Sequence, residues 1–138
     1  MDKPIITRRN DVKNFGGKFQ NQQSFKKHIF EKRKGVCQGC GHQFKITHFV
    51  LDHKFPISLG GKQYEESNVQ LLCKNKCNKD KTIIDLSIIN FCKRIGLINK
   101  CAFEWRLYVP VSFLKEFYDY CFKIHLMAKP IKERDEEW

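Results

Sequence analysis

Near the middle of the chain an acidic residue stands next to a histidine, at Asp52 and His53. Adjacent residues of a strand point to opposite sides, so this pair at the end of a strand can address different partners in one site. A carboxylate suits a hard cation such as Mg²⁺, and a neutral imidazole suits a general base. Phosphodiester hydrolysis needs both a metal and a base. For an isolated Asp-His pair, chance placement on the surface is the competing interpretation.

Four of the seven cysteines form two close pairs. Two residues separate Cys37 from Cys40, and three separate Cys73 from Cys77. Four thiolates from two such turns supply the tetrahedral ligand set of a structural Zn²⁺ site, whereas an odd number of cysteines argues against a disulfide framework. Two alternatives stay open: His42 replaces one cysteine, or one pair consists of free thiols. Buried free thiols are expected at the other three positions, which are Cys92, Cys101 and Cys121.

Length and charge limit the class of protein. With 138 residues, a formal net charge of +11 and 41% hydrophobic residues, the chain suits one folded domain that attracts polyanions. Nucleic acid is the commonest such partner in a cell, and a lysine-rich protein without that role is the alternative. No run of about 18 apolar residues is present, and the first residues lack the apolar core of a signal peptide. We therefore expect an intracellular, cytoplasmic protein that makes no use of a membrane.

The elements that must position these residues follow from hydrophobic periodicity and from turn-forming residues. An extended basic arm is expected first, and an irregular connection is expected between the last two helices. The pattern predicts a helix over 24–34, strands over 44–52 and 69–72, a helix over 78–94 and a final helix from Pro110.

Two further segments lie beyond the Asp-His pair. Asn68 begins the sequence Asn-Val-Gln-Leu-Leu-Cys, and Asn78 begins Asn-Lys-Asp-Lys directly after the last paired cysteine. With the Asp-His pair, a nearby proline and a Gly-Gly pair, this order resembles the HNH nuclease family, also called ββα-metal nucleases. The subgroup it resembles is the one held together by two cysteine pairs. The resemblance covers residues 37–82, about a third of the chain.

This resemblance implies an α+β fold, in which a ββα-metal core with a four-cysteine zinc site is flanked by helices. It leads us to expect a single domain over residues 1–138. Within it, we expect a basic arm and helix over 1–36, the zinc-bound core over 37–96 and a helical C-terminal extension over 97–138.

The resemblance also implies roles for single residues. Asp52 and Asn78 would hold a catalytic Mg²⁺ or Mn²⁺, His53 would be the general base, and Asn68 would brace the loop and help orient His53. Asn78 stands where many members have histidine, a departure that keeps an oxygen donor but weakens metal binding in principle. The structural Zn²⁺ would be held by Cys37, Cys40, Cys73 and Cys77. Contacts to DNA are expected from Arg8, Arg9, Lys54 and Lys81, with a solvated side chain as the alternative for Lys81.

The implied activity is that of a metal-dependent DNA endonuclease acting on double-stranded DNA. Its products would be 5′-phosphate and 3′-hydroxyl ends. A small type II restriction enzyme that works as a homodimer is the favoured role, because two sites related by a two-fold axis cut both strands of a palindrome. Homing, phage-packaging and junction-cleaving nucleases are the alternatives within the family. A non-catalytic zinc-ribbon protein that binds DNA is the alternative outside it.

Overall fold

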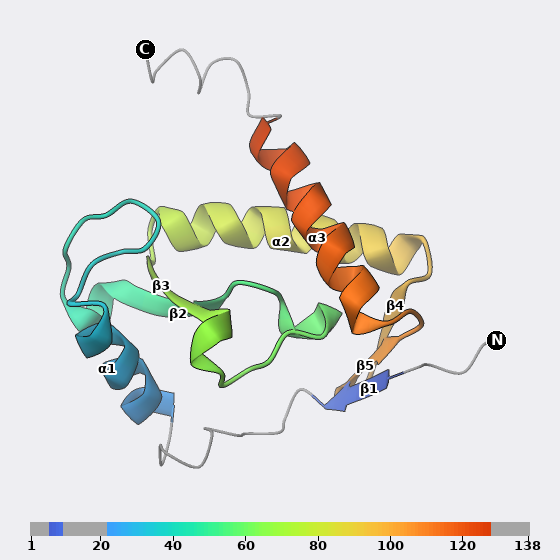
Figure 1. Ribbon diagram of the computed structural model, residues 1–138, viewed down its shortest axis with the longest axis horizontal. Coiled ribbons are helices and arrows are strands. Elements are labelled where there is room, and N and C mark those ends of the chain that lie inside the picture. The colour runs from blue at the N-terminus through green and yellow to red at the C-terminus, as the bar shows by residue number, and fades with distance from the viewer. Residues whose placement is uncertain (1–5, 10–21, 128–138) are drawn as a thin grey trace.

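The computed structural model describes residues 6–9 and 22–127 (Figure 1). At its centre two antiparallel strands, β2 (Phe49–His53) and β3 (Val69–Cys73), pair over their full length. After a short turn the helix α2 (Cys77–Arg94) begins, and it runs alongside the two strands in Figure 1. This β-β-α unit, within a mixed fold of helices and antiparallel sheets, confirms the predicted α+β class.

The first hydrophobic cluster lies between the two strands and the first helix. Phe49, Val69 and Leu71 are almost fully buried because alternate residues of β2 and β3 point to the same face. Helix α1 (Gln22–Lys32) covers this face with Phe25 and Ile29, which are also buried. The apolar spacing that predicts the helix therefore marks the residues that hold it against the sheet.

The second half of the chain adds a small sheet and a long helix. The strands β4 (Ile98–Cys101) and β5 (Glu104–Leu107) pair with each other, and β1 (Ile6–Arg9) pairs with the other edge of β5, giving the order β1-β5-β4. The helix α3 (Val111–Met127) then crosses α2 (Figure 1). The irregular connection predicted before the last helix is wrong, since this segment forms β4 and β5.

A second hydrophobic cluster joins the two halves of the chain. Phe55 and Leu59 lie in the loop after β2 and are buried against Ile88 of α2, Leu107 of β5 and Leu114 of α3. Burial of such side chains is worth about 1.5–3 kcal/mol each. The loop that follows His53 is therefore held in place by the C-terminal part of the chain as well as by the β-β-α unit.

Most element boundaries agree with the sequence predictions, with one clear exception. The strand expected over 44–52 begins only at Phe49, and Ile46–His48 forms a 3-10 turn. Before that turn the chain folds back on the first cysteine pair, where Val36 and Gln43 form an isolated bridge. Phe44 is consequently 39% exposed, not part of a strand. No helix in the described part of the chain is long and apolar enough to cross a membrane.

Candidate functional site

The four paired cysteines converge on one point. Cys37 and Cys40 lie in the turn after α1, Cys73 ends β3 and Cys77 begins α2. Their sulfur atoms all lie within 4.8 Å of one another. Tetrahedral zinc with Zn–S bonds of about 2.3 Å places sulfur atoms about 3.8 Å apart, so the set fits a structural Zn²⁺. Within the described residues His42 does not belong to this group, so its use as a ligand is wrong.

Backbone geometry prepares the cluster for a metal. Burial opposes charge on the Cys37 thiol, but hydrogen bonds from the backbone N–H groups of Cys40, Cys73 and Gly39 outweigh it and lower its pKa to about 6. At Cys77, burial and hydrogen bonds with the other sulfur atoms raise the pKa. The backbone at position 39 passes so close to Cys77 that only glycine fits, since a Cβ on residue 39 would lie 2.7 Å from the Cys77 sulfur.

The remaining cysteines lie outside the cluster. Cys92 is fully buried on α2, and burial raises the pKa of its thiol to about 11. Cys121 is half-buried, whereas Cys101 is exposed. The expectation of a buried thiol is therefore wrong for Cys101, which lies on the outward side of the short β4 strand.

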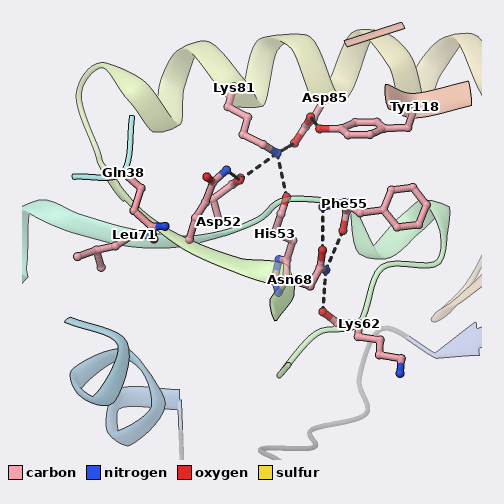
Figure 2. A network of polar contacts seen from close by, with 11 residues as sticks. Gln38, Asp52, His53, Phe55, Lys62, Asn68, Leu71, Lys81, Asp85 and Tyr118 are labelled. Atoms are coloured by element: carbon pink, nitrogen blue, oxygen red, sulfur yellow. Dashed lines mark hydrogen bonds and ion pairs between the residues drawn. The ribbon is translucent and has the colours of Figure 1, made fainter. Parts of the chain in front are cut away.

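Asp52 lies at the centre of a buried polar network (Figure 2). Its carboxylate is only about 10% exposed. Its Oδ2 accepts a hydrogen bond from Gln70 Nε2 at 2.9 Å and forms an ion pair with Lys81 Nζ, also at 2.9 Å. Gln70 is its direct partner across the β2–β3 pair. The other oxygen, Oδ1, has no hydrogen-bond partner among the described residues. The carboxylate is thus fixed through one oxygen, and the other is left free.

The Lys81 ammonium is buried among protein oxygens. It donates to the backbone oxygen of His53 at 2.8 Å and to Asp85 Oδ2 at 2.6 Å, in addition to its contact with Asp52. An ammonium has three donors, and two of them make these hydrogen bonds, while Asp52 is held as an ion pair. A solvated Lys81, the alternative considered above, is excluded because its side chain is only 9% exposed. Its predicted phosphate contact stays a prediction, and in this arrangement the ammonium faces three protein oxygens.

Asp85 links this network to the last helix. Its Oδ1 accepts a hydrogen bond from the hydroxyl of Tyr118 on α3 at 2.6 Å (Figure 2). Burial raises the pKa of Asp85, although the hydrogen bonds from Lys81 and Tyr118 act in the opposite direction. Burial and the bond to Asp85 raise the pKa of the Tyr118 hydroxyl. The sequence prediction missed both residues, although the spacing of Lys81 and Asp85 by four on a helix was a usable signal.

His53 points away from Asp52, as alternation along a strand requires. Its Nε2 lies 2.8 Å from the backbone oxygen of Gln63. A carbonyl oxygen can only accept, so Nε2 carries the proton of the neutral ring and Nδ1 carries the lone pair. Nδ1 has no hydrogen-bond partner within the described part of the chain. The imidazole is therefore held in the tautomer that leaves the lone pair on Nδ1.

Asn68 ties together both ends of the loop after His53. Its Oδ1 accepts a hydrogen bond from the Phe55 N–H at 2.9 Å, and its Nδ2 donates to the backbone oxygens of Phe55 at 3.0 Å and Lys62 at 2.9 Å (Figure 2). The backbone of Asn68 also accepts a hydrogen bond from the Lys54 N–H. Gln63, the partner of His53, directly follows Lys62 in this loop.

Asp52 and His53 share a hollow of about 310 Å³, which is also lined by Asp85 and Trp105. Asn78 is not brought into contact with them. It lies in the first turn of α2, three residues before Lys81 and on the same helix face, but makes no hydrogen bond with Asp52 or His53 in the structure described. Its role as a second metal ligand stays a prediction.

The predicted DNA contacts are spread over the molecule. Lys54 is exposed and lines a larger hollow of about 550 Å³, together with Lys115 and Lys123 of α3. The backbone of Arg8 and Arg9 belongs to β1, opposite Trp105 and Glu104 of β5. The roles of all these side chains toward DNA stay predictions.

Comparison with protein families matches residues 37–83 to the family described as HNH endonuclease. This segment contains both cysteine pairs and the whole β2–β3 pair, and it ends within α2. Residues 37–83 are therefore an HNH domain with a four-cysteine cluster, and nuclease is the general class that the match supports. Comparison with curated proteins and with solved structures finds no match.

Proposed function

We propose that the chain is a divalent-metal-dependent endonuclease that hydrolyses double-stranded DNA. The observation that carries this proposal is the state of two neighbouring side chains. Asp52 is fixed through Oδ2 with Oδ1 free, and His53 is fixed through Nε2 with Nδ1 free. Both line the same hollow. A purely structural pair has no need for one free oxygen and one free basic nitrogen in residues that line the same hollow.

The residues present fit a hard divalent cation. The free Oδ1 of Asp52 is an anionic oxygen, and Asn78 offers an amide oxygen from the same face of α2 that carries Lys81. A cation bound there would neutralise the negative charge that develops on the phosphate and on the leaving oxygen. Oxygen ligands and a partly open site suit Mg²⁺ or Mn²⁺ better than zinc.

The chemical steps assigned to the protein are few. His53 Nδ1 takes a proton from water, whose oxygen attacks phosphorus as the bond from phosphorus to the 3′ oxygen breaks. The leaving 3′ oxygen takes a proton from a solvent water. Gln63 O accepts the hydrogen bond from Nε2 and so keeps the neutral ring in the tautomer that this step needs. The products are a 5′-phosphate and a 3′-hydroxyl end. General base catalysis of this kind contributes about 10²–10⁴-fold to the rate.

The path of the DNA is proposed to follow the larger hollow beside the network. Lys54, Lys115 and Lys123 are exposed around it, and the net charge of +11 favours a polyanion. Replacing Lys115 and Lys123 together by alanine is expected to weaken DNA binding. The slope of the logarithm of the binding constant against the logarithm of the salt concentration should become shallower by about 2, which corresponds to the loss of about two phosphate contacts. An unchanged salt slope would place the DNA elsewhere.

The direct test is plasmid cleavage by the zinc-loaded protein in Mg²⁺ or Mn²⁺, with His53→Ala and Asp52→Asn as inactive variants. His125→Ala serves as the matched control, because His125 lies near the end of α3 and lines neither hollow. We expect both site variants to lose at least about 100-fold in rate and the control to cut normally. Equal behaviour of the wild type and His53→Ala, whether active or inactive, would refute the assignment.

Within this activity we favour a type II restriction enzyme acting as a dimer. Support comes from exposed apolar side chains on α3, since Phe113, Tyr120 and Ile124 are each at least 45% exposed. Large exposed apolar groups gathered on one helix suit an interface between copies. Cleavage at discrete palindromic sites and a dimer in sedimentation would support this role. Random nicking, branched-DNA preference or a monomer with and without DNA would favour the other HNH roles instead.

A further inference from the structure

A buried ammonium beside a metal-binding carboxylate raises an electrostatic difficulty. Lys81 Nζ lies 2.9 Å from Asp52 Oδ2, and both side chains are about nine-tenths buried. A positive charge this close to Asp52 opposes the binding of a divalent cation by the same carboxylate. Unless another group offsets the charge of Lys81, the pair of Asp52 and Lys81 is neutral and attracts a cation weakly.

Asp85 is the group placed to offset it. Its Oδ2 lies 2.6 Å from Lys81 Nζ, and its side chain is 13% exposed. Both of its oxygens already have partners, because Oδ1 accepts the hydroxyl of Tyr118 at 2.6 Å. Both oxygens of Asp85 are therefore engaged by protein donors, whereas Oδ1 of Asp52 has no hydrogen-bond partner among the described residues. With Asp52 and Lys81 it forms a buried set of net charge −1, which is receptive to a cation.

We infer that Asp85, held by Tyr118 of the last helix, is a positioning residue that offsets Lys81 and keeps Asp52 available to the divalent cation. This inference rests on the proposed function, because it concerns the cation of the same site. It assigns a part in that site to two residues that lie beyond the HNH match, which ends at residue 83. Tyr118 fixes Asp85 on the side away from Asp52, so the counter-charge stays on Lys81.

The test is Mn²⁺ binding to the full-length zinc-loaded protein, measured without DNA by the electron paramagnetic resonance signal of free Mn²⁺. Asp85→Asn removes the charge but keeps an oxygen for Lys81 and a polar group for Tyr118. We expect it to weaken Mn²⁺ binding by about tenfold, a moderate effect for one charge several ångströms from a divalent ion. Asp119→Asn is the matched control, because Lys115 and Asp119 form the same i,i+4 pair on an exposed surface. The control should change binding by less than about twofold.

A double variant tests the charge argument independently of the folding of Asp85→Asn. Lys81→Met combined with Asp85→Asn removes both opposite charges and leaves Asp52 with its original net charge of −1. Replacing a buried ion pair by neutral groups is often tolerated. We expect the double variant to bind Mn²⁺ within about threefold of the wild type, because the unopposed ammonium is gone.

The outcomes separate this inference from the proposed function. If the wild type binds Mn²⁺ and cuts DNA while folded Asp85→Asn binds Mn²⁺ as tightly, the inference is wrong and the proposed function stands. The inference is also contradicted if the double variant binds Mn²⁺ about tenfold more weakly than the wild type, as expected for Asp85→Asn alone. A structural role for the Lys81–Asp85 pair would explain that result better. A wild type that neither binds Mn²⁺ nor cuts DNA overturns both.

Discussion

Replacing Asn68 by aspartate changes only the amide nitrogen of the side chain, yet the structure predicts a large effect. The retained oxygen can still accept the Phe55 N–H. The lost Nδ2 donates to the backbone oxygens of Phe55 and Lys62, at 3.0 and 2.9 Å. In Asn68→Asp both hydrogen bonds disappear, and a carboxylate oxygen faces two carbonyl oxygens. The loop that carries Gln63, the partner of His53, loses its anchor.

The size of the effect follows from these contacts. Each hydrogen bond contributes about 0.5–1.5 kcal/mol, and repulsion between the new oxygen and the two carbonyls adds to the loss. We expect Asn68→Asp to lower the free energy of unfolding by about 2–4 kcal/mol. Asn68→Ala loses all three bonds without the repulsion, so we expect about 2–3 kcal/mol. Aspartate, although closer in shape, should be at least as harmful as alanine.

Urea unfolding of the zinc-loaded protein at neutral pH measures the change, with cleavage rate as the second readout. Asn90→Asp is the matched control, because Asn90 is exposed on α2 and its side chain has no hydrogen bond among the described residues. We expect the control to change the free energy of unfolding by about 0.5 kcal/mol or less. The urea dependence should be unaltered in all variants, since the same surface is exposed on unfolding.

The reasoning would be refuted by an Asn68→Asp protein that unfolds at the wild-type urea concentration and cuts DNA at the wild-type rate. Such a result would mean that the loop from Phe55 to Lys62 is held by its apolar contacts alone. A clearly larger loss of unfolding free energy in Asn68→Ala than in Asn68→Asp would also contradict it. That result would mean that the hydrogen bond accepted from the Phe55 N–H stabilises the loop more than the two hydrogen bonds donated by Nδ2.

Two other perturbations test the packing of the loop and the role of the metal cluster. Gly61→Ala is expected to cost at least about 2 kcal/mol in urea unfolding, because its Cβ would lie 1.9 Å from the backbone oxygen of Phe55. Gly41→Ala, where only a φ of +78° opposes the side chain and the space is empty, should cost about 1 kcal/mol. Cys73→Ser should lower the zinc content per chain and the melting temperature, whereas Cys101→Ser at an exposed position should change neither. Equal losses for the two glycine variants, or full zinc content in Cys73→Ser, would contradict these expectations.

The residues with local signals were the ones that could be predicted from the sequence. The helices and β3 follow from apolar periodicity, and the cysteine cluster follows from the close pairs that the structure brings within 4.8 Å. The β4–β5 pair was missed because β4 has one buried residue, Ile98, and no alternation of apolar side chains. Its partner β5, Glu-Trp-Arg-Leu, does alternate between polar and apolar residues, but over only four positions.

The candidate site was predicted less completely, for a related reason. Asp52, His53 and Asn68 are marked by a motif, and the structure gives each a defined set of partners. Asp85 and Tyr118 carry no motif, and the contact between them joins residues 33 positions apart. Such a contact depends on how α3 crosses α2, which no local pattern encodes.

The burial of Phe55 and Leu59 against the C-terminal half limits how this protein can be dissected. Both residues belong to the HNH segment, yet the side chains that cover them come mostly from positions beyond residue 83. A fragment ended at that boundary would expose two apolar side chains next to His53. In protein engineering, the unit to transplant is therefore the segment from α1 through α3. A graft of the motif alone would lack the apolar side chains that cover Phe55 and Leu59.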